Sequence, residues 1–263
     1  MGRHIGATKW GTDVRTLFGG LAATLATASL MTGPADAATA TPCTGTMAGT
    51  TVGRLVVPSE STCTLTDVQV DGNIRIQAGG ALITDDSTIN GSVMGRDART
   101  VRLIDTDVVG TGATGNINLA DTRGRIVIGS QGCALDPGVG NNITLVDNHG
   151  TIAICFMNVG ETILLQGNDK TIGAFHNTTG NPFIVQGNTG TFIRLRDNEV
   201  GLSGGGSMLV HRNTTTGNAR TPDGLRLVRN DVHNRLSCVG NHDAPVGSGN
   251  SADNGMAGQC AQL

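Results

Sequence analysis

A short repeated unit across residues 143–198 constrains the fold more than any other feature of the chain. Each unit has an apolar residue, a second apolar residue two positions later, and an Asn three positions after that. A repeat of about twenty residues that holds two strand-like units is typical of a chain wound as a coil around a core. The Asn residues recur roughly every ten positions and continue beyond this block: Asn148, Asn158, Asn168, Asn177, Asn188, Asn198, Asn213, Asn230 and Asn241.

The rest of the chain after residue 50 also consists of short β-like segments. They are rich in β-branched residues and end in Gly, Asn or Asp, and no stretch shows convincing helical spacing. Parallel strands without crossover helices favour a coil that returns to its own sheet after one turn. We therefore expect an all-β, right-handed parallel β-helix, with about 20–22 residues per coil and nine or ten coils; the handedness follows the general preference of crossover connections.

The apolar pairs of the repeat predict the core, because residues two apart on a strand point the same way. The Asn that closes each unit is expected to adopt the left-handed conformation of a sharp corner. Its amide is also expected to bond to the same amide in the coils above and below, as a ladder. The predicted core pairs are Ile143/Leu145, Ile163/Leu165, Phe183/Val185, Ile193/Leu195, Met208/Val210, Leu225/Leu227 and Leu236/Cys238.

The N-terminus is typical of a secretory signal peptide. Basic residues precede an Ala/Leu-rich stretch, and Ala35-Asp36-Ala37 provides small residues for cleavage. We expect a signal peptide over 1–37, a polar leader over 38–50, the β-helix over 51–241 and a C-terminal cap over 242–263. The protein is thus predicted to be secreted, without a membrane span after signal removal. The mature chain has a net charge of −4, which argues against a nucleic-acid partner.

Six cysteines support a coil of this length in an oxidising compartment. They are Cys43, Cys63, Cys133, Cys155, Cys238 and Cys260. Paired in sequence order, their separations are 20, 22 and 22 residues, about one coil each. Residues one coil apart on neighbouring strands are near enough for a disulfide. Since six cysteines allow 15 pairings, the sequential pairing is a prediction from the period.

Four short segments carry a resemblance to known proteins: Leu55-Val-Val-Pro-Ser-Glu-Ser-Thr-Cys-Thr-Leu65, Gly72-Asn73-Ile74, Cys238-Val239-Gly240-Asn241 and Gly258-Gln259-Cys260. With them the chain resembles secreted actinobacterial right-handed parallel β-helix proteins of unknown function. The resemblance covers most of the mature chain, and it implies a fold similar to that of pectate lyases. It implies no established activity and transfers no catalytic residue.

Two pairs of aspartates could hold a metal. Asp85 and Asp86 precede Asp105 and Asp107 by about one coil, so carboxylates could stack and share Ca²⁺. A Ca²⁺-dependent polysaccharide lyase, or another carbohydrate-active β-helix enzyme, would use such a cluster with Arg102, Arg123 or Arg125 as base. The competing interpretation is that Asp is a common turn residue with a solvated side chain. Apart from Ca²⁺ in that case, no cofactor is expected.

Arginines accumulate in the C-terminal half and could form a stripe for an acidic polymer. The alternative is ordinary solubilising charge on an outward face. If the stripe binds, the partner would be an extracellular polysaccharide or a cell-wall polymer. The candidate residues are Arg194, Arg196, Arg212, Arg226 and Arg229.

A third possibility is an ice-binding face. Thr151, Thr171 and Thr191 are spaced by 20 residues and could form a regular Thr column, although Thr is also simply a good strand residue. Taken together, the sequence favours an exported, non-enzymatic β-helix scaffold that binds an extracellular ligand or polymer. No catalytic residue is assigned.

Overall fold

The chain divides into two units, Met1–Ala37 and Ala38–Leu263. A computed structural model describes residues 39–110, 114–130, 137–217 and 224–263. The expected signal peptide, residues 1–37, lies outside this described part. Within it the chain forms β-strands and no helix, and the strands pair in parallel and in register. The sequence-based prediction of an all-β parallel β-helix is confirmed.

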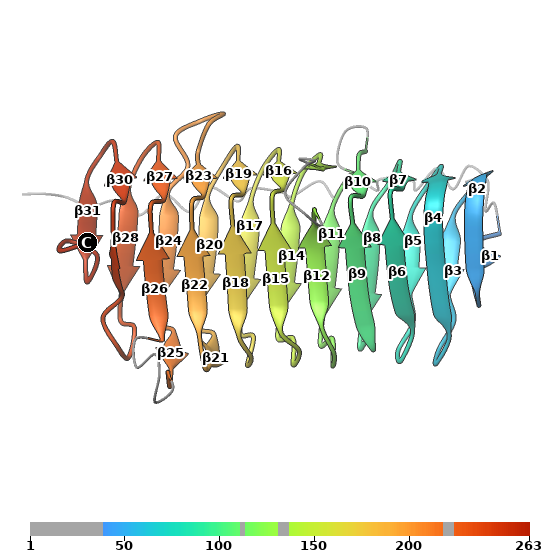
Figure 1. Ribbon diagram of the computed structural model, residues 1–263, viewed down its shortest axis with the longest axis horizontal. Helices are drawn as coiled ribbons and strands as arrows, with labels where there is room; N and C mark the ends of the chain where they lie inside the picture. The colour runs from blue at the N-terminus through green and yellow to red at the C-terminus, as the bar shows by residue number, and fades with distance from the viewer. Residues whose placement is uncertain (1–38, 111–113, 131–136, 218–223) are drawn as a thin grey trace, which may run out of the picture. The chain divides into compact units, whose positions relative to one another are not determined.

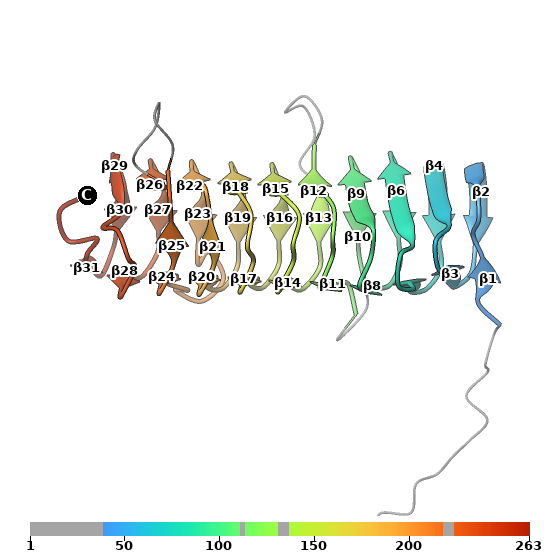
Figure 2. The same cartoon turned by 90° about the horizontal axis from the view of Figure 1, so that it is seen from below.

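Each coil has three sides, and successive coils stack along one axis (Figure 1). One central coil consists of β14, β15 and β16. The chain then enters β17, which pairs with β14 in the same sheet. We call the 11-stranded sheet side A, the longer strands of the 18-stranded sheet side B, and its two-residue strands side C. Figure 2 shows the same stack turned by 90°.

Side A contains one strand from each coil. Its strands are β1 (Thr41–Pro42), β3 (Leu55–Val57), β5 (Ile74–Ile76), β8 (Val93–Arg96), β11 (Ile117–Ala120), β14 (Ile143–Val146), β17 (Ile163–Gln166), β20 (Phe183–Gln186), β24 (Met208–His211), β28 (Leu236–Val239) and β31 (Met256–Gly258).

Sides B and C share one sheet because β2 and β4 are long enough to run through both. Side B contains β2 (Thr46–Val52), β4 (Thr62–Val70), β6 (Ala81–Asp85), β9 (Thr100–Ile104), β12 (Ile126–Gly129), β15 (Ile152–Cys155), β18 (Ile172–Phe175), β22 (Ile193–Arg196), β26 (Leu225–Val228) and β29 (Val246–Ser248). Side C contains β7 (Thr88–Ile89), β10 (Asp107–Val108), β13 (Gly138–Val139), β16 (Asn158–Val159), β19 (Thr178–Thr179), β23 (Glu199–Val200), β27 (Asp231–Val232) and β30 (Ser251–Ala252). A separate pair, β21 (Thr189–Gly190) and β25 (Thr214–Thr215), forms a two-stranded sheet.

The flanking segments belong to the stack as well. β1 lies within the expected polar leader, and β2 begins in it and ends two residues beyond it. β1 pairs with β3, and β2 pairs with β4. β29, β30 and β31 lie in the expected C-terminal cap and pair with β26, β27 and β28. The parallel pairing therefore extends beyond the expected limits of 51 and 241, and side A has 11 strands where nine or ten coils were expected.

The core lies inside the coil and consists of aliphatic side chains from all three sides. Inward and outward positions alternate, as in β14, where Ile143 and Leu145 are buried between partly exposed neighbours. All seven predicted core pairs are buried. Two of them, Ile193/Leu195 and Leu225/Leu227, lie on side B, while the other five lie on side A. The unit thus recurs every ten residues because each coil uses it on two sides.

Two ladders of buried Asn side chains run along the stack. In each ladder the Asn Nδ2 donates to the Oδ1 of the Asn in the next coil at 2.9–3.0 Å. Each Oδ1 also accepts a backbone N–H, and each Nδ2 also donates to a carbonyl of the preceding coil, as Asn168 does to Leu145. The A–B ladder contains Asn148, Asn168, Asn188, Asn213 and Asn241, and Gln259 closes it; the B–C ladder contains Asn177, Asn198, Asn230 and Asn250.

Two expectations about the Asn residues need correction. The left-handed residue is not the Asn but its predecessor, for example Asp147, His176 or Arg212, with φ of 52°, 54° and 53°. That kink turns the following Asn inward, where its amide can ladder. Asn158 is not a ladder residue: it is exposed in β16, and Met157 occupies the ladder position, its N–H donating to Asn177 Oδ1 at 3.1 Å.

Disulfides join the terminal coils to their neighbours. Cys43 is bonded to Cys63 near the N-terminal end, and Cys238 to Cys260 at the C-terminal end, with Cα–Cα distances of 5.2 and 5.1 Å. Both predicted bonds are confirmed, and all four cysteines are buried. The third predicted bond involves Cys133, which lies outside the described residues. Its expected partner, Cys155, lies at the end of β15.

Candidate functional site

The outward face of side B carries arginines on two neighbouring strands near the C-terminal end. Register places Arg194 of β22 beside Arg226 of β26, and Arg196 beside Val228. The previous strand, β18, contributes Gly173 and Phe175 at the matching positions. Alternation makes these positions point outward, because Ile193, Leu195, Leu225 and Leu227 between them fill the core.

These side chains surround a depression of about 470 Å³. We call its charged rim the Arg face, defined as Arg194, Arg196, Arg226 and Arg229. Phe175 and Val228 contribute apolar surface to the same depression. Gly173 has no side chain, and the Phe175 ring occupies the space beside it, 2.6 Å from where a Cβ would stand. The shape of the depression therefore follows from the residue types at successive coils.

Aromatic rings and one partly buried acid orient the guanidinium groups. The guanidinium carbon of Arg194 lies 4.7 Å from the Phe192 ring centre, and that of Arg196 lies 5.6 Å from the Phe175 ring centre. Such contacts are cation–π interactions. They hold long side chains over fixed positions without occupying their hydrogen-bond donors.

Asp197, at the corner after β22, is the acid. Its carboxylate accepts two hydrogen bonds from Arg229, from Nε at 2.6 Å and from an Nη at 2.8 Å. Arg196 Nε lies 3.1 Å away and His176 Nε2 lies 3.3 Å away. The hydrogen bond from Arg229 is the largest cause that lowers the pKa of Asp197, and the same contact raises the pKa of Arg229. Asp197 is therefore ionised at neutral pH.

The charges on this face do not balance. The Asp197 side chain is only 16% exposed, whereas those of Arg196 and Arg229 are 49% and 60% exposed. Among the described residues, Asp197 is the only carboxylate that forms an ion pair with the Arg face, and Arg194 and Arg226 form none. Four guanidinium groups and one carboxylate leave an accessible excess of positive charge. The arrangement can bind an anion with oxygens in a row.

Of the five predicted arginines, four form this face and one does not. Arg212 follows β24 and lies at the A–B corner, with a left-handed φ of 53°. Its backbone N–H donates to Val239 on side A. Sequence analysis missed Phe175, Asp197 and Val228, because only the coil register shows that residues from three separate strands surround one depression.

The four aspartates proposed to hold a metal are not brought together. Asp85 lies in β6 opposite Ile104, and Asp107 lies in β10 opposite Thr88. Asp86 and Asp105 are left-handed corner residues, with φ of 48° and 44°, and follow the paired residues Asp85 and Ile104. Only this last pair stacks from one coil to the next. The four do not form a group with metal-ligand spacing in the described part of the chain.

The three arginines considered as lyase bases are dispersed. Arg102 lies on the outward face of β9, exposed and four coils away from Arg194. Arg123 lies 3.9 Å from Asp97 in an ion pair. Arg125 is exposed just before β12. In the described part of the chain, the depression that contains Asp86 has none of these three arginines in its lining.

The Thr column is interrupted. Ile152 pairs with Ile172, which brings Thr151 and Thr171 into line, but Ile172 then pairs with Ile193. Phe192, not Thr191, therefore follows Thr171 in the stack. An extra residue in this coil moves Thr191 one position out of register.

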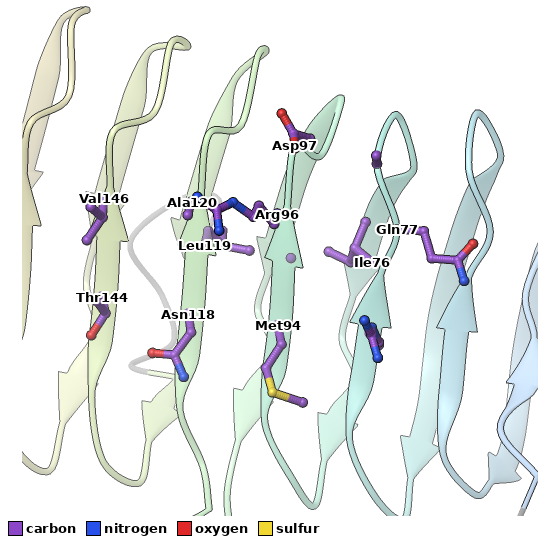
Figure 3. A pocket seen from close by; sticks show the side chains of 13 residues that line it. Ile76, Gln77, Met94, Arg96, Asp97, Asn118, Leu119, Ala120, Thr144 and Val146 are labelled. Carbon is purple, nitrogen blue, oxygen red and sulfur yellow. The ribbon is translucent and has the colours of Figure 1, made fainter.

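A second depression, of about 680 Å³, lies on side A over β5, β8, β11 and β14. Figure 3 shows Met94, Asn118 and Thr144 pointing from neighbouring strands on this face. Of its charged lining residues, Arg96 pairs with Asp121 at 2.9 Å, and Asp97 is the only carboxylate. Because glycoside hydrolysis ordinarily needs two carboxylates, this depression does not provide that arrangement.

Comparison with known proteins adds no assignment. No family model, no curated protein and no solved structure matches the chain. Among the described residues, no helix is long and apolar enough to cross a membrane.

Proposed function

We propose that the protein is an exported, non-enzymatic β-helix scaffold that binds an acidic extracellular polysaccharide through the Arg face. The observation that carries this proposal is the depression of about 470 Å³ whose rim holds Arg194, Arg196, Arg226 and Arg229 against one ion-paired carboxylate. Guanidinium groups are suited to carboxylates because they bind them with two parallel hydrogen bonds.

The spacing of the arginines supports a linear ligand over a small ion. Arg194 and Arg226 occupy the same outward position on neighbouring strands, which are about 4.8 Å apart in a sheet. Like charges at directly opposing positions are destabilising unless an anion lies between them. A chain of acidic sugars running along the coil axis offers carboxylates to both arginines.

The disulfides and the predicted signal peptide support export of the protein. Two disulfides join the terminal coils, and structural disulfides persist in oxidising compartments. The predicted signal peptide over 1–37 leads to the same location. The scarcity of aromatic residues, 2% of the chain, argues against binding neutral sugars by ring stacking.

The test is binding of the mature, oxidised protein to polygalacturonate, measured by isothermal calorimetry at low and high salt, with dextran as the neutral polymer. We expect binding to polygalacturonate only, and weakening at high salt because the contacts are charge–charge. Replacing Arg194 and Arg226 together by Ala should weaken binding by about tenfold or more, the equivalent of one or two charge-assisted hydrogen bonds.

The matched control is Arg102→Ala, since Arg102 occupies the same outward position on β9 and is exposed. It should bind as the unaltered protein does. Equal weakening in the control and in the double variant would show that net charge alone matters and would reject a defined site. New double bonds in the polymer, seen as ultraviolet absorbance, would reject the non-enzymatic proposal.

A further inference from the structure

The residue at the third position of side C changes along the stack. Backbone hydrogen bonds along the stack align the third position of side C from coil to coil. In four successive coils this position is Gly: Gly140, Gly160, Gly180 and Gly201. In the next two coils it is His233 and then Asp253. Earlier coils carry Asp71, Asn90 and Val109 at this position, so the fold accepts Gly or a larger residue here. His233 and Asp253 place two ionisable side chains on neighbouring coils.

The first position of side C is acidic in two successive coils, that of His233 and the one before it. Asn158 and Thr178 pair with each other, and Thr178 pairs with Glu199. Glu199 in turn pairs with Asp231 on the neighbouring strand. Two carboxylates in register repel each other, so this pair is unfavourable unless a positive charge lies close to both.

His233 lies beside these two carboxylates. Its Nε2 is 3.2 Å from Glu199 Oε1, and one ligand atom each from Glu199, Asp231 and His233 lies within 4.8 Å of the others. Atoms bound to one zinc ion are roughly 3.3 Å apart, given bond lengths near 2.1 Å and tetrahedral angles. Small rotations of these partly exposed side chains are enough to reach that spacing.

Two residues of the next coil contact two of these three side chains. Ser251 Oγ donates to Asp231 Oδ1 at 2.6 Å. His233 Nδ1 faces Asp253 Oδ2 at 3.7 Å, within ion-pair range. Metal-binding His residues usually present their other ring nitrogen to a carboxylate, and metal-binding carboxylates are usually hydrogen-bonded in turn. The cluster therefore has the outer contacts of a metal site.

The charge of the cluster is also uncompensated. Glu199, Asp231 and Asp253 contribute three negative charges, and in the described part of the chain no Lys or Arg forms an ion pair with any of them. Hydrogen bonding to Glu199 is the largest cause that raises the pKa of His233. Even a protonated His233 balances only one of the three charges.

We propose that Glu199, Asp231 and His233 bind a divalent transition-metal ion of the Zn²⁺ class, with Asp253 and Ser251 positioning the ligands. One imidazole and two carboxylates suit zinc better than calcium, which prefers oxygen ligands throughout. Three protein ligands leave a coordination position for water or for a group of a bound ligand. The site shares no residue with the Arg face, although Glu199 lines a depression together with Asp197. This inference does not rest on the proposed function.

The experiment is Zn²⁺ titration by calorimetry on untagged, metal-stripped mature protein, with Ca²⁺ titrated in parallel. We expect saturable binding of one Zn²⁺ per chain and much weaker binding of Ca²⁺. Both His233→Ala and Glu199→Gln should weaken Zn²⁺ binding by at least about tenfold, the lower range for disturbing a metal site. Circular dichroism of each variant checks that the coil still forms.

The control is His149→Ala. His149 also contacts an acid from the next coil, Asp169, at 2.9 Å, but Lys170 already lies 3.6 Å from that acid. This variant should bind Zn²⁺ as the unaltered protein does. Unchanged Zn²⁺ affinity in His233→Ala, or tighter binding of Ca²⁺ than of Zn²⁺, would overturn the proposal. Unchanged Zn²⁺ affinity in Glu199→Gln would also overturn it, because Glu199 is one of the three proposed ligands.

Discussion

At the scale of single residues, two consecutive residues have different roles at each corner. The first residue takes the left-handed conformation, which Gly, Asp and Asn adopt at least cost. The second, an Asn in the ladder coils, turns inward and satisfies both its amide and nearby backbone groups. Asn188 shows the full set, with its Oδ1 accepting from Asn168 and its Nδ2 donating to Asn213 and to the Leu165 carbonyl.

Removing one ladder amide should therefore cost more than a typical hydrogen bond. Asn188→Ala removes the side-chain oxygen that accepts from the N–H and Nδ2 of Asn168 and the Nδ2 that donates to the Leu165 carbonyl. The buried N–H of Asn168 is then left without an acceptor. We expect a loss of about 2–4 kcal/mol in unfolding free energy, because unsatisfied buried polar groups keep their full desolvation cost. Chemical denaturation of the oxidised protein measures it.

Asn158→Ala is the matched control, since Asn158 is the same residue type but exposed and outside both ladders. It should change the unfolding free energy by less than about 0.5 kcal/mol. Similar losses in the two variants would contradict the ladder as a source of stability.

At the scale of elements, the terminal coils are the weakest part of the stack. In the described part of the chain β1 and β2 pair with the next coil on one side only. Fraying exposes strand edges, and the Cys43–Cys63 bond limits it by joining the first coil to the second. At the other end, Gln259 closes the A–B ladder and Cys260 joins the last coil to β28.

Replacing Cys43 and Cys63 by Ser should loosen the N-terminal coil alone. The bond spans 20 residues, and closing a loop of that length is worth about 3 kcal/mol in the chain-entropy account. Hydrogen exchange should become faster in β2 and unchanged in β28, where the Cys238–Cys260 bond provides an internal control. Faster exchange at both ends would show that the two ends are coupled through the whole stack.

At the scale of the whole molecule, each coil contacts mainly the coils before and after it. Stability in such repeats is close to a sum of coil terms and neighbour terms. Leu165 is buried in the centre, paired with Leu145 and Val185. Leu165→Ala should cost about 2–5 kcal/mol through the cavity it leaves.

The distribution of that loss tests the nearest-neighbour picture. Hydrogen exchange in Leu165→Ala should rise most in β14, β17 and β20 and least in β3 and β5, several coils away. A uniform rise across all strands would show that the stack unfolds as one cooperative unit.

The repeat itself determined much of this protein. Alternating apolar residues and recurrent Asn predicted the parallel β-helix, the core pairs, the ladders and two disulfides, because each depends only on local period. At Thr191 the error occurred because one extra residue shifts the count. At Asn158 the coil length is unchanged, but the Asn follows the ladder position, which Met157 occupies. In a strand of period two, a slip of one residue exchanges the inward and outward faces.

Only the tertiary structure decided which distant residues meet. The coil from Asn198 to Asn230 spans 32 residues, whereas central coils span 20. Parallel pairing aligns the buried apolar residues whatever the length of the loop between them, since lengthening a loop costs little entropy. Sequence distance therefore could not place Arg226 beside Arg194, or Asp231 and His233 beside Glu199. Burial of the core positions set that register, and both proposed sites follow from it.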